Sequence, residues 1–167
     1  MVGSILLLSK LENQHIPARK TVFRLDEQIR QSIVAMEPDW SKKNIDFDVE
    51  LKEIEFEANE PMLRHVWDNL IANAVKFGPQ NGVVRMRLEK EESTIRFTID
   101  DEGCGLSDEA LKHIYDKFYQ ADSSHKEEGN GLGLALVKRI LSLENGKIYA
   151  ENLPEKGCRF TVEFNKS

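Results

Sequence analysis

NLIANAVKF, residues 69–77, is the most informative segment of this sequence, because it is typical of a helix with two unlike sides. Asn69, Asn73 and Lys76 are spaced i, i+4 and i+7, so they share one helix face. Apolar residues cluster beside and behind that face: Val66, Trp67, Leu70, Ile71, Ala74 and Phe77. The pattern predicts an amphipathic helix over residues 60–77, which Gly78 and Pro79 end.

The polar stripe of this helix has two readings. Asparagine is a mediocre helix former, so two asparagines beside a lysine need a reason. Amide oxygens are hard, neutral ligands for magnesium, and a lysine is a point charge for phosphate. The alternative is an ordinary solvated face, and the stripe alone leaves both open.

Outward from this helix, apolar residues alternate with polar ones in six stretches that predict strands: 45–49, 54–56, 84–88, 95–99, 147–150 and 159–164. Further helices are predicted at 29–36 and 132–143. Strands with one polar face indicate a mixed, mostly antiparallel sheet with helices on one face, an α/β sandwich of two layers. Residues 4–13 predict a short helix that Pro17 ends, and we expect it to be the tail of a longer helix.

Composition limits the class of protein. The 167 residues are 40% hydrophobic and 31% charged, as in soluble globular proteins, and 23 Lys and Arg against 29 Asp and Glu give a net charge of −6. An acidic chain without a basic run argues against nucleic acid or a polybasic membrane anchor. No apolar run approaches the roughly 20 residues of a membrane span. Cys104 and Cys158 form no metal spacing or disulfide framework, so we expect a cytoplasmic location.

The segment DEGCG, residues 101–105, follows the strand predicted at 95–99. Glycines at 103 and 105 let a ligand approach the backbone closely. The Asp101 carboxylate only accepts hydrogen bonds, so it suits an exocyclic amine such as that of adenine. The alternative is a plain tight turn, in which Asp and Gly are common.

The segment GNGLGL, residues 129–134, leads directly into a predicted helix. Free amides at a helix start, with the helix dipole behind them, make an anion site. The sequence is not a P-loop, and leucines at 134 and 136 stand where the Rossmann pattern needs its third glycine. The alternative is a glycine hinge before a helix.

Together and in this order, these segments resemble the catalytic, ATP-binding domain of bacterial two-component sensor histidine kinases, over residues 19–164. NLIANAVKF looks like the asparagine box, DEGCG the first glycine box, YDKFYQAD (115–122) the phenylalanine box and GNGLGLALVKRI (129–140) the second glycine box. The resemblance implies the Bergerat-type fold shared with gyrase and heat-shock chaperone ATPases. LLLSKLEN, residues 6–13, looks like the end of the family's dimerisation and phosphoacceptor hairpin.

The resemblance also implies roles for the asparagine helix. Asn73 would coordinate Mg²⁺ with Asn69 in support, Lys76 would contact phosphate and Phe77 would stack on adenine.

For the other boxes, the resemblance implies that Asp101 would accept from the adenine amine, while Gly103 and Gly105 would admit the base. Phe118 would pack a mobile lid over residues 119–130. The phosphates would be cradled by the backbone of Gly129, Gly131, Leu132 and Gly133.

The sequence departs from the family pattern at two positions. Gln120 stands where the lid often begins with arginine, which affects how the terminal phosphate is neutralised, although Lys126 could substitute. Gly157 is followed by Cys158 in place of the usual threonine, and a thiol is a weaker hydrogen-bonding group than a hydroxyl.

None of the four histidines has the context of the family's phosphoacceptor, which an acidic residue or asparagine usually follows. We therefore expect a domain comprising residues 19–167, preceded by the hairpin end and linker at 1–18. This domain would use Mg-ATP to phosphorylate a histidine on a hairpin that is absent here, for transfer to a response regulator. The full-length protein would be a homodimer and membrane-attached.

Two rival functions remain. An ATP-hydrolysing clamp of the gyrase or chaperone type uses a glutamate four residues before its metal asparagine, but that position is Asn69, which cannot act as a base. A nucleotide-dependent docking module would bind ATP and transfer nothing.

Overall fold

A computed structural model describes residues 2–13, 19–119 and 132–165. Its centre is a five-stranded sheet in the order β2-β4-β5-β7-β6. The strands are β2 (Asp46–Leu51), β4 (Val83–Glu91), β5 (Thr94–Asp100), β6 (Gly146–Asn152) and β7 (Cys158–Asn165). The pair β2–β4 is parallel and the other three pairs are antiparallel. The predicted mixed, mostly antiparallel sheet is therefore confirmed.

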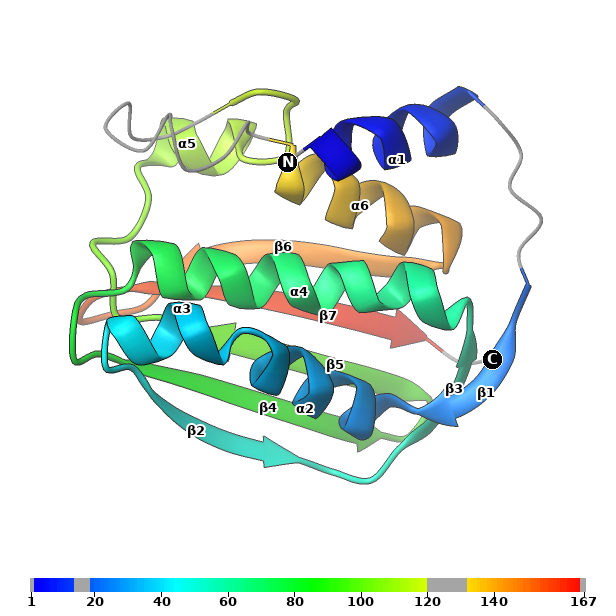
Figure 1. Cartoon of the computed structure of the whole chain (residues 1–167), viewed down its shortest axis with the longest axis horizontal. Helices are drawn as coiled ribbons and strands as arrows, with labels where there is room; N and C mark the ends of the chain where they lie inside the picture. Colours follow the sequence, from blue (N-terminus) through cyan, green and yellow to red (C-terminus); the bar gives the residue numbers. More distant parts are fainter. Residues whose placement is uncertain (1, 14–18, 120–131, 166–167) are drawn as a thin grey trace.

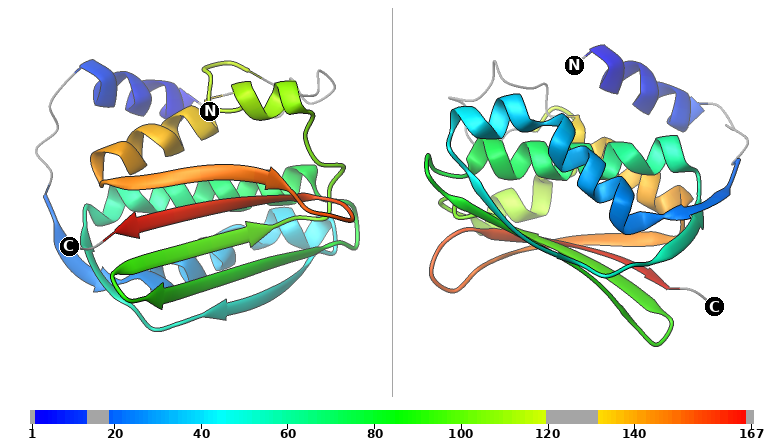
Figure 2. Two further views of the ribbon diagram at one scale, coloured as in Figure 1. Left: turned by 180° about the vertical axis from the view of Figure 1, so that it is seen from behind. Right: turned by 60° about the horizontal axis from the view of Figure 1, so that its bottom comes forward.

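Three helices cover one face of this sheet: α2 (Leu25–Ala35), α4 (Glu60–Phe77) and α6 (Gly133–Leu143) (Figures 1 and 2). A separate antiparallel pair joins β1 (Thr21–Arg24) to β3 (Glu55–Ala58). The remaining helices are α1 (Val2–Asn13), α3 (Glu37–Lys42) and α5 (Asp108–His113). None of the helices in the described parts of the chain is both long and apolar enough to span a membrane.

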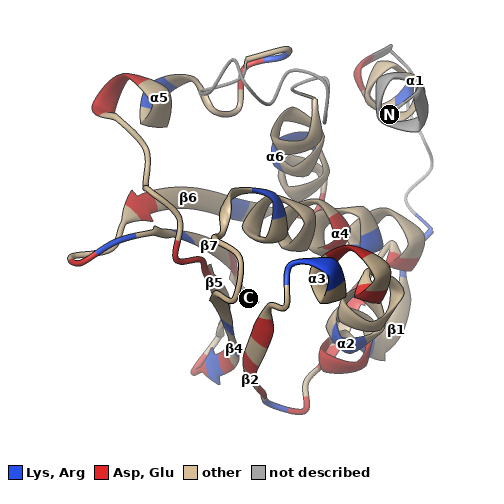
Figure 3. Cartoon of the chain, turned by 60° about the vertical axis from the view of Figure 1, so that its left-hand side comes forward, with Lys and Arg blue, Asp and Glu red and all other residues tan. Residues whose placement is uncertain are grey.

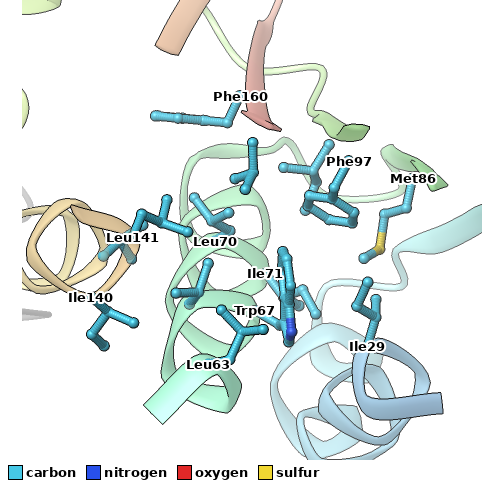
Figure 4. Close-up of a cluster of buried hydrophobic side chains, with 14 of the residues drawn as sticks. Ile29, Leu63, Trp67, Leu70, Ile71, Met86, Phe97, Ile140, Leu141 and Phe160 are labelled. Atoms are coloured by element: carbon cyan, nitrogen blue, oxygen red, sulfur yellow. The ribbon is translucent and has the colours of Figure 1, made fainter. Parts of the chain in front are cut away.

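Helix α4 has the predicted bounds because its end signals are local. The Asn59 side chain accepts a hydrogen bond from the Met62 amide (3.1 Å), Pro61 occupies the first turn and Gly78 follows the last residue. Its apolar side lies on the sheet, where Trp67 meets the Phe97 ring edge-on with centroids 4.8 Å apart. Figure 4 shows this core, with Ile140 and Leu141 of α6 packed beside α4. The burial leaves the polar stripe facing away from the sheet.

The other face of the sheet is charged and pairs its charges across neighbouring strands. Arg87 contacts Asp48 (3.3 Å), Arg96 contacts Glu163 (2.7 Å) and Arg159 contacts Asp100 (2.7 Å). Figure 3 shows acidic bands along β2 and mixed charge along β4. This face is therefore solvated, and no helix in the described parts of the chain covers it (Figure 2).

Helix α1 lies on α6, on the side away from the sheet (Figure 1). Leu8 and Leu11 are buried there, and Arg139 of α6 donates hydrogen bonds to the Leu11 carbonyl (3.0 and 3.3 Å). Glu12 accepts a 2.7 Å ion-pair hydrogen bond from Lys117. The residue predicted to end this helix, Pro17, lies outside the described residues.

Candidate functional site

The polar stripe of α4 is reachable from outside, as a ligand site requires. Asn69, Asn73 and Lys76 are each partly exposed, and the Lys76 ammonium lies 5.1 Å from the centre of the Phe77 ring. Phe77 is 42% exposed, so it does not join the buried cluster as its spacing predicted. It is the last residue of α4. An exposed ring beside a lysine fits the predicted role in base stacking, which stays a prediction.

The start of α6 meets α4 at Asn69. A Cβ atom on Gly133 would lie 2.7 Å from Asn69 Oδ1, so the two residues are in direct apposition. Asn69 Nδ2 donates to the His65 carbonyl (2.7 Å), which orients the amide oxygen toward that helix start. Leu132 precedes the helix and is buried. The structure thus joins two predicted segments that are more than 60 residues apart.

Asp101 is buried beside the carboxyl-terminal end of α4, with 7% of its surface exposed. The Gly103 amide (2.9 Å) and the Cys158 amide (3.3 Å) both donate to Asp101 Oδ1. Among the described residues no donor reaches Oδ2, so this oxygen can accept from a ligand. Burial raises the pKa of the Asp101 carboxyl above its ordinary value; the two amide hydrogen bonds oppose the rise and the Asp100 charge adds to it.

The loop that carries Asp101 packs closely against two other segments, and glycines make the fit possible. A Cβ on Gly103 would lie 2.5 Å from the Phe77 carbonyl oxygen, so the loop touches the end of α4. Gly157 has φ +95° and a Cβ there would overlap the Asp101 carbonyl oxygen. Gly105 also has a positive φ, +80°. These contacts place the Asp101 carboxylate beside the last turn of α4.

Sequence reasoning missed two side chains that fix this loop. Asn152 on β6 accepts from the Leu106 amide (2.8 Å) and donates to the Leu106 carbonyl (2.6 Å). Glu102 accepts from the Val83 amide (2.8 Å) at the start of β4. Each side chain bonds the backbone of a residue that is distant in the sequence, so no local sequence pattern predicts either contact.

The Cys158 departure lies directly against Asp101. Its backbone carbonyl accepts from the Asp101 amide (3.0 Å) and its side chain is buried. Burial, with smaller contributions from the charges of Asp101 and Asp100, raises the pKa of the Cys158 thiol to about 12. The thiol is therefore neutral at physiological pH, a weak hydrogen-bonding group on the floor of the site.

The predicted lid follows Phe118. Phe118 is 64% exposed and has φ +65°, so it packs into no core among the described residues. Gln120, Lys126, Gly129 and Gly131 lie outside those residues. In the parts of the chain that are described, no cluster of three or more His, Cys, Asp or Glu could hold a metal ion.

Comparisons with known proteins agree with this fold. The model of the family described as histidine kinase-, DNA gyrase B-, and HSP90-like ATPase matches residues 58–167. The heme sensor protein HssS of Staphylococcus saprophyticus is 33% identical over 167 residues, which are 99% of this chain and 36% of that protein. The chain spans about a third of the length of the curated relatives it matches.

Solved structures of histidine kinases also resemble the chain. The catalytic domain of histidine kinase ThkA is 30% identical, with a TM-score of 0.79 over 89% of this chain and 96% of that one. ThkA in complex with the response regulator protein TrrA is 27% identical (TM-score 0.79, 99% of this chain, 48% of that one). Full-length ShkA in complex with AMPPNP is 26% identical (TM-score 0.85, 99% and 35%).

The family match covers most of the chain, and the ThkA catalytic domain matches it nearly from end to end. The chain therefore belongs to the histidine kinase-, DNA gyrase B- and HSP90-like ATPases and is a catalytic ATPase domain of the sensor histidine kinase type.

Proposed function

We propose that this chain binds Mg-ATP along the polar stripe of α4 and donates the terminal phosphate to a histidine on a dimerisation hairpin, for onward transfer to a response regulator. The observation that carries the proposal is the buried Asp101 carboxylate at the end of α4, whose Oδ2 accepts from no donor among the residues that the structure describes. A carboxylate in this position accepts from an adenine amine and rejects the carbonyl that guanine presents instead.

The remaining residues act along α4 from this point. Phe77 stacks on the base, with Gly103 and Gly105 admitting it, and Lys76 neutralises phosphate. The phosphates are held by the backbone of Gly129, Gly131, Leu132 and Gly133, the last of which begins α6. Phe118 packs the lid.

The donor chemistry of α4 fits a magnesium ion. Asn73 offers a neutral amide oxygen on the partly exposed stripe, and Asn69 stands one turn away against Gly133. Mg²⁺ takes few protein ligands and keeps several waters, so one or two such oxygens beside the phosphates are enough to hold it. The bound metal would neutralise phosphate charge, while this chain's residues position the nucleotide.

Residues 1–18 belong to this proposal as the end of the hairpin and its linker, and residues 19–167 as the catalytic domain. The ThkA complex with TrrA supports a response regulator as partner, and the ShkA complex with AMPPNP supports ATP. The whole protein would be a homodimer with this domain on the cytoplasmic side of a membrane.

Replacing Asp101 tests the proposal. The change Asp101→Ala should cost about 1.5–3 kcal/mol of ATP binding, or roughly tenfold to over a hundredfold, because it removes a charge-assisted hydrogen bond. Isothermal titration with ATP and GTP measures it, with Asp46→Ala on the exposed edge of β2 as the control. Unchanged ATP affinity in Asp101→Ala would reject the assignment of the base site.

A further inference from the structure

Lys43, which immediately follows α3, directs its ammonium group at the end of α4. Lys43 Nζ donates to the carbonyl oxygens of Val75 (2.6 Å), Gly78 (2.6 Å) and Lys76 (3.2 Å). An ammonium has three protons, so these three acceptors use all of its donors. In Figure 3 the basic segment at the end of α3 lies beside α4. The Lys43 side chain therefore forms a specific contact with the end of α4 and does not project into solvent.

This contact caps the carbonyl end of α4. The last four carbonyls of a helix have no partner within it, and here the Ala74 carbonyl accepts from the Gly78 amide (3.0 Å). Lys43 takes the next two, those of Val75 and Lys76, and the Phe77 carbonyl lies against Gly103. A cation at this end also complements the helix dipole. The final turn is thus held by Lys43 from one direction and by the Asp101 loop from another.

The backbone of Lys43 is fixed as well. Its carbonyl accepts from the Asn81 amide (2.8 Å), and the next residue, Asn44, donates from its side chain to that of Asn81 (2.8 Å). Asn81 stands in the connection from α4 to β4. The connection from α4 to β4 therefore bonds Lys43 twice, through Asn81 to its backbone and through the Gly78 carbonyl to its side chain. Lys43 has little freedom to move away from α4.

We propose that Lys43 is a positioning residue for the nucleotide. The turn it caps carries Lys76 and Phe77, and the Phe77 carbonyl is the surface on which the loop of Asp101 rests. Lys43 thus fixes the position of Lys76, on the phosphate side, relative to the Asp101 loop, on the base side. It does so without touching the nucleotide, because its three donors are already used. The inference rests on the proposed ATP site.

The test compares Lys43→Met with Lys42→Met, the matched change at the neighbouring exposed lysine. Methionine keeps the length of the side chain and removes the charge and all three donors. We expect Lys43→Met to bind ADP and adenosine about tenfold more weakly, since misplacement of a site by a fraction of an ångström has effects of this order or larger. Both ligands are affected because both ends of the site move. Lys42→Met should bind like the unchanged chain.

Two further readouts separate positioning from stability. Lys43→Arg keeps a charged donor with several N–H groups and should recover most of the affinity that Lys43→Met loses. In Lys43→Met, hydrogen exchange at the Gly78 amide should accelerate, because the final turn of α4 frays. Titrations are made at 15 °C, where circular dichroism verifies that each variant is folded; Lys43→Gln replaces Lys43→Met if the latter does not fold.

A lower melting temperature with unchanged affinity for both ligands would overturn the inference, because Lys43 would then only stabilise the fold. So would equal losses in Lys43→Met and Lys43→Arg. If the unchanged chain itself bound neither ADP nor adenosine, the proposed function would fail first, and the outcomes are therefore distinguishable.

Discussion

At the scale of single residues, Asp101 has an ionised form that is costly to the fold. Its pKa is raised, mainly by burial, so the folded protein holds the proton more tightly than the unfolded chain does. The stability contributed by this group is present below the unfolded pKa of about 3.9 and is lost as pH rises through the folded value. At neutral pH the ionised carboxylate therefore lowers the free energy of unfolding. A role of this charge in ligand binding would explain why it is kept.

Asp101→Asn should accordingly raise the free energy of unfolding at pH 7. The asparagine oxygen can still accept from the Gly103 and Cys158 amides, so the loop keeps its hydrogen bonds while the buried charge disappears. The gain should shrink as pH falls toward about 4, because the original carboxyl then takes up its proton in the folded protein and the buried charge is lost there too. Urea unfolding at both pH values measures the difference. The control is Asp46→Asn at an exposed site, and a gain that is no larger at pH 7 than at pH 4 would contradict the argument.

At the scale of helices and strands, the elements that could be predicted are those whose ends are determined by local sequence signals. Helix α4 begins and ends as predicted because Asn59, Pro61 and Gly78 act within a few residues of its ends. The missed elements are short: β1, α3 and α5 have four to six residues each. β1 is a strand only because β3 pairs with it. The position of β2 as a parallel neighbour of β4 likewise depends on contacts that no local pattern encodes.

The same division holds for the candidate site. The sequence named Asn69 and Gly133 from two separate motifs, but their apposition follows from how α6 packs on α4. Asn152 and Lys43 belong to no sequence motif. Only their hydrogen bonds in the folded chain connect them to the Asp101 loop and to the end of α4.

The junction of α4 and α6 can be tested with Gly133→Ala. Alanine is a better helix former than glycine by up to about 1 kcal/mol, so the fold should be as stable or slightly more stable. The new methyl group would displace the Asn69 side chain, and Mg-ATP affinity should fall roughly threefold to tenfold, the loss of about one hydrogen bond. Thermal unfolding and calorimetric titration measure the two effects. Ser142→Ala at the far end of α6 is the control, and undiminished Mg-ATP affinity in Gly133→Ala would place the phosphates elsewhere.

At the scale of the whole molecule, the proposal separates nucleotide binding from phosphoryl transfer. None of the chain's four histidines has an acceptor-like context. We expect no phosphohistidine on the chain alone and slow labelling of its acceptor hairpin supplied as a separate polypeptide, since a tether normally provides a high effective concentration. Radiolabelled ATP, with the hairpin and with its histidine-to-alanine variant, is the assay.

The results of that assay distinguish the rival functions. Acid-labile label on the chain alone would reveal an overlooked acceptor. Steady phosphate release without the hairpin would favour an ATPase clamp, and tight Mg-ATP binding without label on either polypeptide would favour a docking module.

The ion-paired face of the sheet has a consequence for the proposed homodimer. Two copies tethered together meet at a high effective concentration, so any adhesive surface would lock them to each other. Contact between two such faces would strip water from paired charges, and the desolvation cost offsets the attraction gained. In the proposed homodimer, the two sheet faces should therefore not adhere to each other.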